Sequence, residues 1–163
     1  MAKNKEEKTN VMRVLEQKKI AYTPHSYPHE EGVAVDGVTV AQSMGFDPAI
    51  VFKTLVARGA SKQYYVFDVP VAENLDLKKA AKAVGEKSIE MIHQKELLPL
   101  TGYVHGGCSP VGMKKLFPTV FHETAENLAA MIVSAGKIGY QVELSPRDLA
   151  ALVRAKFADI IVE

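Results

Sequence analysis

The sequence predicts one α/β domain in which short helices surround a mixed, partly closed, barrel-like β-sheet. Short stretches of alternating polarity, typical of strands, are interleaved with short amphipathic stretches, typical of helices. The chain of 163 residues has the length of one ordinary domain, and it contains no internal repeat or linker. We therefore expect residues 1–163 to form a single domain.

Composition limits the class of protein further. The chain is 47% hydrophobic and 24% charged, which favours a folded core over disorder. No apolar run is long enough to span a membrane, and Met1–Thr9 lacks the apolar segment of a signal peptide. The lone cysteine, Cys108, suits a reducing cytoplasm. A net charge of +1 argues against a broad nucleic-acid-binding face but permits contact with one end of a nucleic acid.

The first third of the chain predicts helices that flank an extended segment. Lys5–Lys19 carries an apolar stripe at helical spacing. Tyr22–Tyr27 is expected to be extended because prolines lie within and directly after it. Asp36-Gly37 is typical of a turn, and Thr39–Met44 predicts a short helix that ends at Gly45.

Ile50–Arg58 is the clearest strand in the sequence. Its alternation puts Lys53 on a face with apolar neighbours, where a lysine costs desolvation unless an anion meets it. The alternatives are a ligand-binding lysine and one whose ammonium reaches the edge while its stem packs. A hairpin loop at residues 59–61 then leads into an antiparallel return strand, Gln63–Val71.

The remaining elements are short. Helices or helical turns are expected at Asp76–Val84, Gln94–Leu98 (ended by Pro99), Glu123–Asn127 and Ser145 to about Lys156. Strands are expected at Ser88–Ile92, Val120–His122, Ala130–Ser134, Tyr140–Leu144 and Phe157–Val162. Ser145, Pro146 and Asp148 match a helix start, so Asp148 has a structural explanation as the residue that reaches back to the cap.

The stretch from Gly106 to Lys115 has the composition of a ligand-binding loop. Three glycines, a proline and a hydroxyl occur within seven residues. Backbone N–H groups in such a turn can bind an anion or stabilise a developing oxyanion, but a purely structural loop has the same composition. The spacing matches neither a P-loop nor a dinucleotide-binding fingerprint. His25 and His29 have no partners at ligand spacing, so we expect no metal.

Four segments together resemble the YbaK/EbsC family and the editing domain inserted in bacterial prolyl-tRNA synthetases. The segments are FKTLV (residues 52–56), GGCSPVGMKK (106–115), VSAGKIGYQVEL (133–144) and SPRDL (145–149). The resemblance runs from about Val11 to Val162, and within the family it is nearest to free-standing Cys-tRNA(Pro) deacylases. It implies cleavage of a wrongly attached amino acid, cysteine above all, from the 3′ end of tRNA, with no cofactor and with prolyl-tRNA synthetase as a partner.

The resemblance also assigns roles to individual residues. Lys53 would hold the terminal phosphate or ribose, and the N–H groups of Gly106 and Gly107 would stabilise the oxyanion. The matching substrate-binding positions are Tyr27, Thr54, Ser109, Pro110, Gly112 and Asp148. No histidine is placed by sequence to activate Ser109 or Cys108, so the attacking group is expected to be the substrate's own thiol or a water molecule.

The sequence departs from the family pattern at two positions. Asp36 and Gln141 stand where some relatives carry an aromatic residue and a serine, which leaves alanine and other small amino acids as alternative substrates. Two other classes of function also remain, a non-catalytic module that binds tRNA or a synthetase and a binder of small phosphorylated molecules. The sequence does not decide the oligomeric state.

Overall fold

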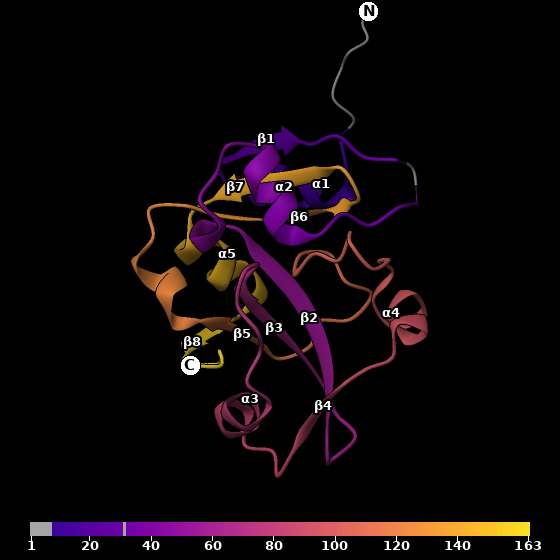
Figure 1. Ribbon diagram of the computed structural model, residues 1–163, viewed down its shortest axis with the longest axis vertical. Coiled ribbons are helices and arrows are strands. Elements are labelled where there is room, and N and C mark those ends of the chain that lie inside the picture. The colour runs from indigo at the N-terminus through magenta and orange to yellow at the C-terminus, as the bar shows by residue number, and fades with distance from the viewer. Residues whose placement is uncertain (1–7, 31) are drawn as a thin grey trace, which may run out of the picture.

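Two β-sheets organise the chain in the computed structural model, which describes residues 8–30 and 32–163 (Figure 1). The larger sheet has five strands in the order β4-β2-β3-β5-β8: Ile89–Met91, Phe52–Gly59, Tyr64–Pro70, Thr119–His122 and Lys156–Ala158. It is mixed, because β3 and β8 run parallel to β5 whereas β2 is antiparallel to β3 and β4. The smaller sheet is antiparallel, in the order β1-β7-β6: Tyr22–Ser26, Tyr140–Leu144 and Met131–Lys137.

The helices are short and lie around the sheets. They are α1 (Asn10–Gln17), α2 (Gly37–Ser43), α3 (Leu77–Val84), α4 (Gln94–Thr101), α5 (Pro146–Val153) and the 3-10 turns Pro48–Ile50 and Glu123–Asn127. The prediction of a mixed α/β fold with short helices is therefore confirmed. No helix in the described part of the chain has the length and apolar character that crossing a membrane requires.

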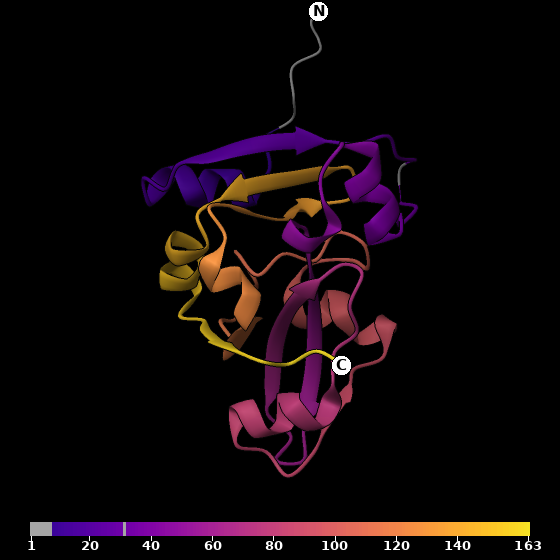
Figure 2. The same ribbon diagram turned by 60° about the vertical axis from the view of Figure 1, so that its left-hand side comes forward.

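The predicted partial closure of the sheet is wrong. Both views place the three-stranded sheet next to the end at which β2 begins (Figures 1 and 2), but across residues 8–30 and 32–163 the two sheets share a single parallel bridge, Val51 to Ile132. Directly after that bridge, β2 pairs with β3 from Phe52 onward. In the described part of the chain this bridge is isolated and no ladder continues from it, so the two sheets stay separate and do not close into a barrel.

Each sheet buries apolar side chains against its neighbours. Between the sheets lie Phe52 and Phe121 of the larger sheet, Met131 and Val142 of the smaller one, and Leu149 of α5. The opposite face of the larger sheet packs on α3, in the cluster Tyr65, Phe67, Val69, Ala80, Ala81 and Ile160. Strand β3 is thus buried on both faces, which explains its nearly continuous apolar sequence.

Several element boundaries differ from those the sequence predicts. Helix α2 begins at Gly37 and not at Thr39, because the Asp36 side chain caps it by accepting a hydrogen bond from the Thr39 N–H. Strand β2 begins at Phe52, because residues 48–50 form a 3-10 turn. The first helix, expected from Lys5, is described only from its cap, Thr9, and the rest of that expectation lies outside the described residues.

Helix α4 continues through Pro99 to Thr101, although the sequence predicts that it ends before the proline. Pro99 lies near the end of the helix, where a single missing N–H costs one hydrogen bond. The Thr101 hydroxyl donates to the Leu97 carbonyl, and the Gly102 N–H donates to the Leu98 carbonyl. Gly102, in the left-handed conformation, therefore ends the helix in place of Pro99.

Candidate functional site

A cavity of about 520 Å³ lies where the two sheets approach each other. Its walls come from the start of β2, from α2 and the segment before it, from the loop after α4, and from the paired strands β6 and β7. Strand β4 pairs with β2 only over Ala57–Gly59, so it does not cover Phe52–Leu55. Consecutive residues of β2, which point to opposite faces of the sheet, can therefore line the same cavity.

Lys53 is the cation of this cavity wall. Its side chain is partly buried, and burial lowers the pKa of its ammonium below the usual value. The carboxylates of Asp36 and Glu73 oppose that shift by favouring the charged form, and Asp36 also lines the cavity. A partly desolvated ammonium interacts more strongly with a bound anion than an exposed one does.

The two glycines that open the loop have different positions. Gly106 lines the cavity with φ +91°, and a Cβ atom there would lie 2.7 Å from the Cβ of Ala34. Gly107 is buried, does not line the cavity, and donates its N–H to the Val104 carbonyl at 2.9 Å. Its missing Cβ allows close packing against the backbone of residues 137 and 138. Of the two N–H groups assigned to an oxyanion, that of Gly107 is thus already engaged within the loop.

The rest of the loop faces elsewhere. Ser109 is fully buried, and its hydroxyl accepts a hydrogen bond from the Val111 N–H. Pro110 and Gly112 line a separate groove of about 130 Å³. Asp148 is exposed in the first turn of α5, where its backbone N–H donates to the Ser145 hydroxyl that caps the helix. These four residues do not line the cavity that holds Lys53.

Tyr27 and Thr54 do line the cavity. Tyr27 is buried, and burial raises the pKa of its phenol. The Thr54 hydroxyl donates to Oδ1 of Asp68 at 2.5 Å, across the β2–β3 pair. Asp68 is 0% exposed, and burial raises the pKa of its carboxyl to about 7. Asp68 was not predicted as a site residue. The sequence signal that could have found it is a lone acidic residue inside the apolar run YYVFDVP, since a buried carboxyl is often functional.

Ser134 and Gln141 form the opposite wall as a cross-strand pair of β6 and β7. The Ser134 hydroxyl accepts a hydrogen bond from the Gly136 N–H. Gln141 is 8% exposed, and its Oε1 has no hydrogen-bond partner among the described residues. An unpartnered buried acceptor that lines a cavity is available to a ligand with a hydrogen-bond donor.

Cys108 lines the cavity but is poorly suited to attack an ester. Its side chain is 7% exposed, and burial together with the nearby Asp68 carboxyl raises the pKa of the thiol to about 12. Since the thiolate is the nucleophilic form, this thiol is unreactive at neutral pH. The described residues contain no cluster of side chains that could hold a metal ion, and His25 pairs instead with Glu143 at 2.7 Å.

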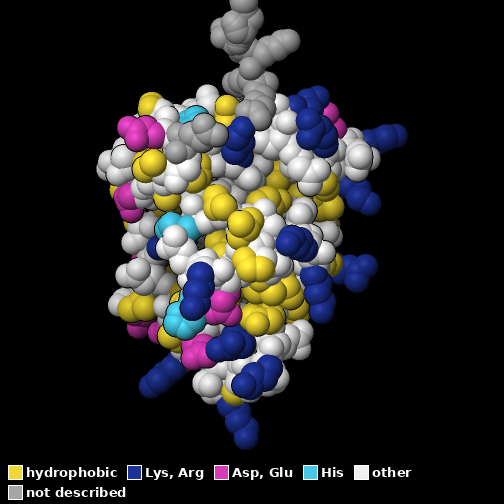
Figure 3. Space-filling view, turned by 90° about the vertical axis from the view of Figure 1, so that its right-hand side faces the viewer, with side chains coloured by type: hydrophobic (Ala, Val, Ile, Leu, Met, Phe, Trp, Pro, Cys, Tyr) yellow, Lys and Arg dark blue, Asp and Glu magenta, His cyan; other side chains and the backbone are white. Residues whose placement is uncertain are grey.

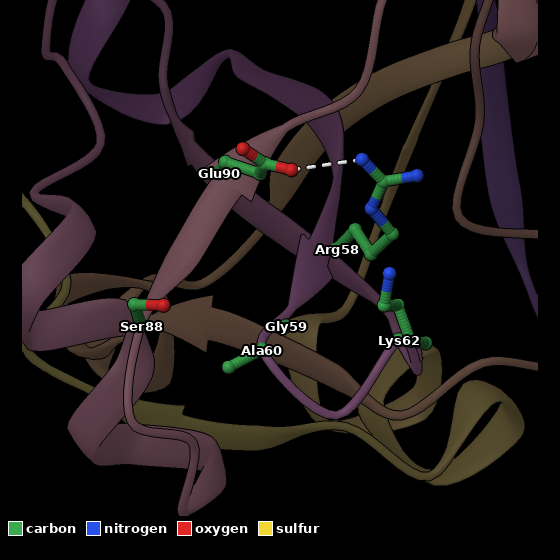
Figure 4. Close-up of a pocket in the computed structure, with 6 residues that line it drawn as sticks. All are labelled: Arg58, Gly59, Ala60, Lys62, Ser88 and Glu90. Carbon is green, nitrogen blue, oxygen red and sulfur yellow. Dashed lines mark hydrogen bonds and ion pairs between the residues drawn. The ribbon is translucent and has the colours of Figure 1, made fainter.

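A second pocket, of about 260 Å³, lies at the β2–β3 hairpin and β4 (Figure 4). It contains Arg58 and Lys62, but the Arg58 guanidinium forms an ion pair with Glu90 at 2.8 Å.

Figure 3 shows a third surface feature, apolar side chains exposed on the face that carries α4. Leu98 of α4 and Leu116 of the following loop are among the exposed apolar residues of the chain. Among the described residues, neither feature combines a partly buried cation with an unpartnered buried polar atom, whereas the first cavity has both Lys53 and the Oε1 atom of Gln141.

Comparisons with known proteins show the family to which the chain is similar. Residues 32–152 match the aminoacyl-tRNA editing domain. The chain is 46% identical over 161 residues to a protein of Enterococcus faecalis named Cys-tRNA(Pro)/Cys-tRNA(Cys) deacylase EbsC, and the alignment covers 98% of each protein.

Solved structures show the same fold. A crystal structure described as a trans-editing enzyme for prolyl-tRNA synthetase superposes with a TM-score of 0.79 at 26% identity, covering 94% of this chain and 95% of the other. The hypothetical protein APE2540 superposes with a TM-score of 0.82 at 20% identity, covering 93% and 99%, which supports the fold alone. From the matched domain and the full-length similarity, the chain belongs to the aminoacyl-tRNA editing domain family, among the YbaK/EbsC proteins.

Proposed function

We propose that this protein is a trans-editing deacylase that cleaves the ester between a mischarged amino acid, above all cysteine, and the 3′-terminal adenosine of tRNA(Pro). The observation that carries the proposal is the convergence of Lys53 and Gly106 on one cavity from distant parts of the chain. The volume of about 520 Å³ is within the range of small-ligand sites and suits the terminal adenosine with a small side chain. The full-length relative named as a Cys-tRNA(Pro) deacylase supports the same substrate.

Lys53 and Gly106 have separate roles in this proposal. The Lys53 ammonium binds the terminal phosphate or ribose and so holds the ester in place. The Gly106 backbone, unobstructed by a Cβ, approaches the ester carbonyl and stabilises the oxyanion that forms there. Tyr27 and Thr54 complete the wall around the amino acid.

The attacking group comes from the substrate or the solvent. Cys108 has a thiol with a pKa of about 12, and the Ser109 hydroxyl is fully buried outside the cavity. With cysteine, the substrate thiol attacks its own ester carbonyl, a carbon–sulfur bond forms, and the carbon–oxygen bond to the ribose breaks. The thiol proton goes to the departing hydroxyl of the adenosine. With a substrate that has no thiol, water must attack, and the products are the free amino acid and tRNA.

A deacylation assay tests the proposal. Labelled Cys-tRNA(Pro) and Ala-tRNA(Pro) are incubated with the wild type and with Lys53→Ala, and the Lys82→Ala variant serves as the control because Lys82 is an exposed lysine of α3. We expect the wild type to accelerate cleavage of Cys-tRNA(Pro), Lys53→Ala to reduce the rate about 100-fold, and Lys82→Ala to retain it. Failure of the folded wild type to accelerate cleavage of either tRNA would leave a non-catalytic binding function.

Prolyl-tRNA synthetase is the proposed partner. The net charge of +1 gives the chain little general attraction for tRNA, so a synthetase that holds the tRNA would supply affinity that this protein lacks. The same assay with and without the synthetase tests this point. A lower KM for Cys-tRNA(Pro) in its presence is the expected result.

A further inference from the structure

A buried carboxyl group lies directly behind the part of the cavity wall formed by Thr54. Asp68 of β3 is the cross-strand partner of Thr54 in β2, and the Thr54 hydroxyl donates to Oδ1 of Asp68. The other carboxyl oxygen, Oδ2, has no hydrogen-bond partner among the described residues. A carboxyl group in such a place costs free energy to bury, so packing alone does not explain it.

The surroundings of Asp68 are mainly apolar. Its partner on β5 is Phe121, and the nearby thiol of Cys108 remains protonated. An apolar side chain of similar size would fill the same space without the desolvation cost. Among the described residues, the Asp68 side chain makes one hydrogen bond, to Thr54, and this is therefore the interaction to explain.

This hydrogen bond determines what Thr54 offers to a ligand. A hydroxyl group has one proton, and in Thr54 that proton points to Asp68 and away from the cavity. Oδ1 keeps a lone pair for it whether the carboxyl is ionised or protonates at Oδ2. Towards the cavity, the Thr54 oxygen can only accept a hydrogen bond.

On the basis of the proposed function, we propose that Asp68 is a positioning residue: by accepting the Thr54 proton, it makes Thr54 an acceptor for the α-ammonium group of the aminoacyl ester. The ammonium is the strongest hydrogen-bond donor on such a substrate. Gln141 fits the same donor-bearing ligand, because its Oε1 on the cavity wall is also an acceptor without a partner in the described part of the chain. Asp36 adds a carboxylate to this wall.

Two non-hydrolysable ligands test the proposal by direct binding. One is cysteine joined through an amide to 3′-amino-3′-deoxyadenosine, and the other is the same molecule without the α-amino group. We expect the wild type to bind the first about tenfold or more tightly, the usual effect of a hydrogen bond to a charged group. Asp68→Val should lose most of this preference, whereas Asp68→Asn should keep it because the amide oxygen still accepts the Thr54 proton.

A double-mutant cycle shows whether Asp68 acts through Thr54. Thr54→Val should reduce kcat/KM for Cys-tRNA(Pro) by about tenfold, and adding Asp68→Val to it should cause little further loss. Thr54→Ser, which keeps the hydroxyl, should retain activity. Thermal unfolding checks that each variant is folded. Asp68→Val is expected to fold because an apolar side chain replaces a fully buried carboxyl.

The outcomes separate this inference from the function on which it rests. If the wild type cleaves Cys-tRNA(Pro) but Asp68→Val keeps the full preference for the ammonium ligand, the positioning role is wrong. Equal binding of the two ligands by the wild type also overturns it, because Thr54 then contacts some other group of the substrate. A wild type that cleaves no mischarged tRNA refutes the deacylase proposal instead.

Discussion

Replacement of Asp68 by asparagine should make the stability of the protein less dependent on pH. Burial raises the pKa of this carboxyl from 3.8 to about 7 in the folded protein. Between these values the native state holds a proton that the unfolded state has released, so the wild type loses stability as pH rises. A shift of this size corresponds to at most about 4 kcal/mol, reached once the pH exceeds the folded-state pKa.

Urea unfolding of both proteins from about pH 4 to about pH 8 measures the effect. The stability of Asp68→Asn relative to the wild type should increase steadily across that range, because the other titrating groups cancel in the difference. Asp159→Asn is the control. The Lys79 ammonium lowers the pKa of the Asp159 carboxyl below its usual value of 3.8, so the stability that it contributes is lost only below that pH, and the difference between this variant and the wild type should stay nearly constant over the range measured. If the difference in unfolding free energy between Asp68→Asn and the wild type does not change with pH, the reasoning that Asp68 is a buried carboxyl with a raised pKa is refuted.

Two further predictions concern the loop. Gly106→Ala should lower both deacylation and the free energy of unfolding, because the new Cβ meets Ala34 at 2.7 Å in a left-handed conformation. Gly45 has a similar φ but open space around it, so Gly45→Ala should lower the free energy of unfolding in urea by only about 1 kcal/mol and leave activity unchanged. Equal losses of unfolding free energy in the two variants would exclude a steric effect at Gly106. Cys108→Ala should keep deacylation of Cys-tRNA(Pro) within about threefold of the wild type, since the thiol is protonated at neutral pH; loss of activity in a folded variant would contradict its passive role.

The sequence predicted local features well where one strong pattern determined them. Alternating polarity located the β2–β3 hairpin and put Lys53 on it, and capping residues located α3 and α5. Where two local effects competed, the prediction failed, as at Pro99, whose lost hydrogen bond mattered less than the terminating Gly102. Gly106 and Thr54 do line the cavity with Lys53, but their roles in catalysis stay predictions.

The features that sequence reasoning missed depend on contacts between distant segments. Nothing in the local sequence shows that Asp68 lies behind Thr54, since that requires the register of two strands. Ser134 was missed for the same reason, because its position on the wall depends on how β6 approaches β2. The direction of the loop after Gly107 is likewise set by packing against residues 137 and 138.

Because β4 pairs with only the last part of β2, the two parts of this strand contribute differently to stability and to ligand binding. From Ala57 to Gly59, β2 is held on both sides, so substitutions there should mainly change folding stability. From Lys53 to Leu55, the described strand that pairs with β2 is β3, and these partly buried residues border the cavity, so substitutions there should mainly change ligand binding. Variation in substrate preference can therefore accumulate in these three neighbouring residues while the rest of the strand keeps the scaffold intact.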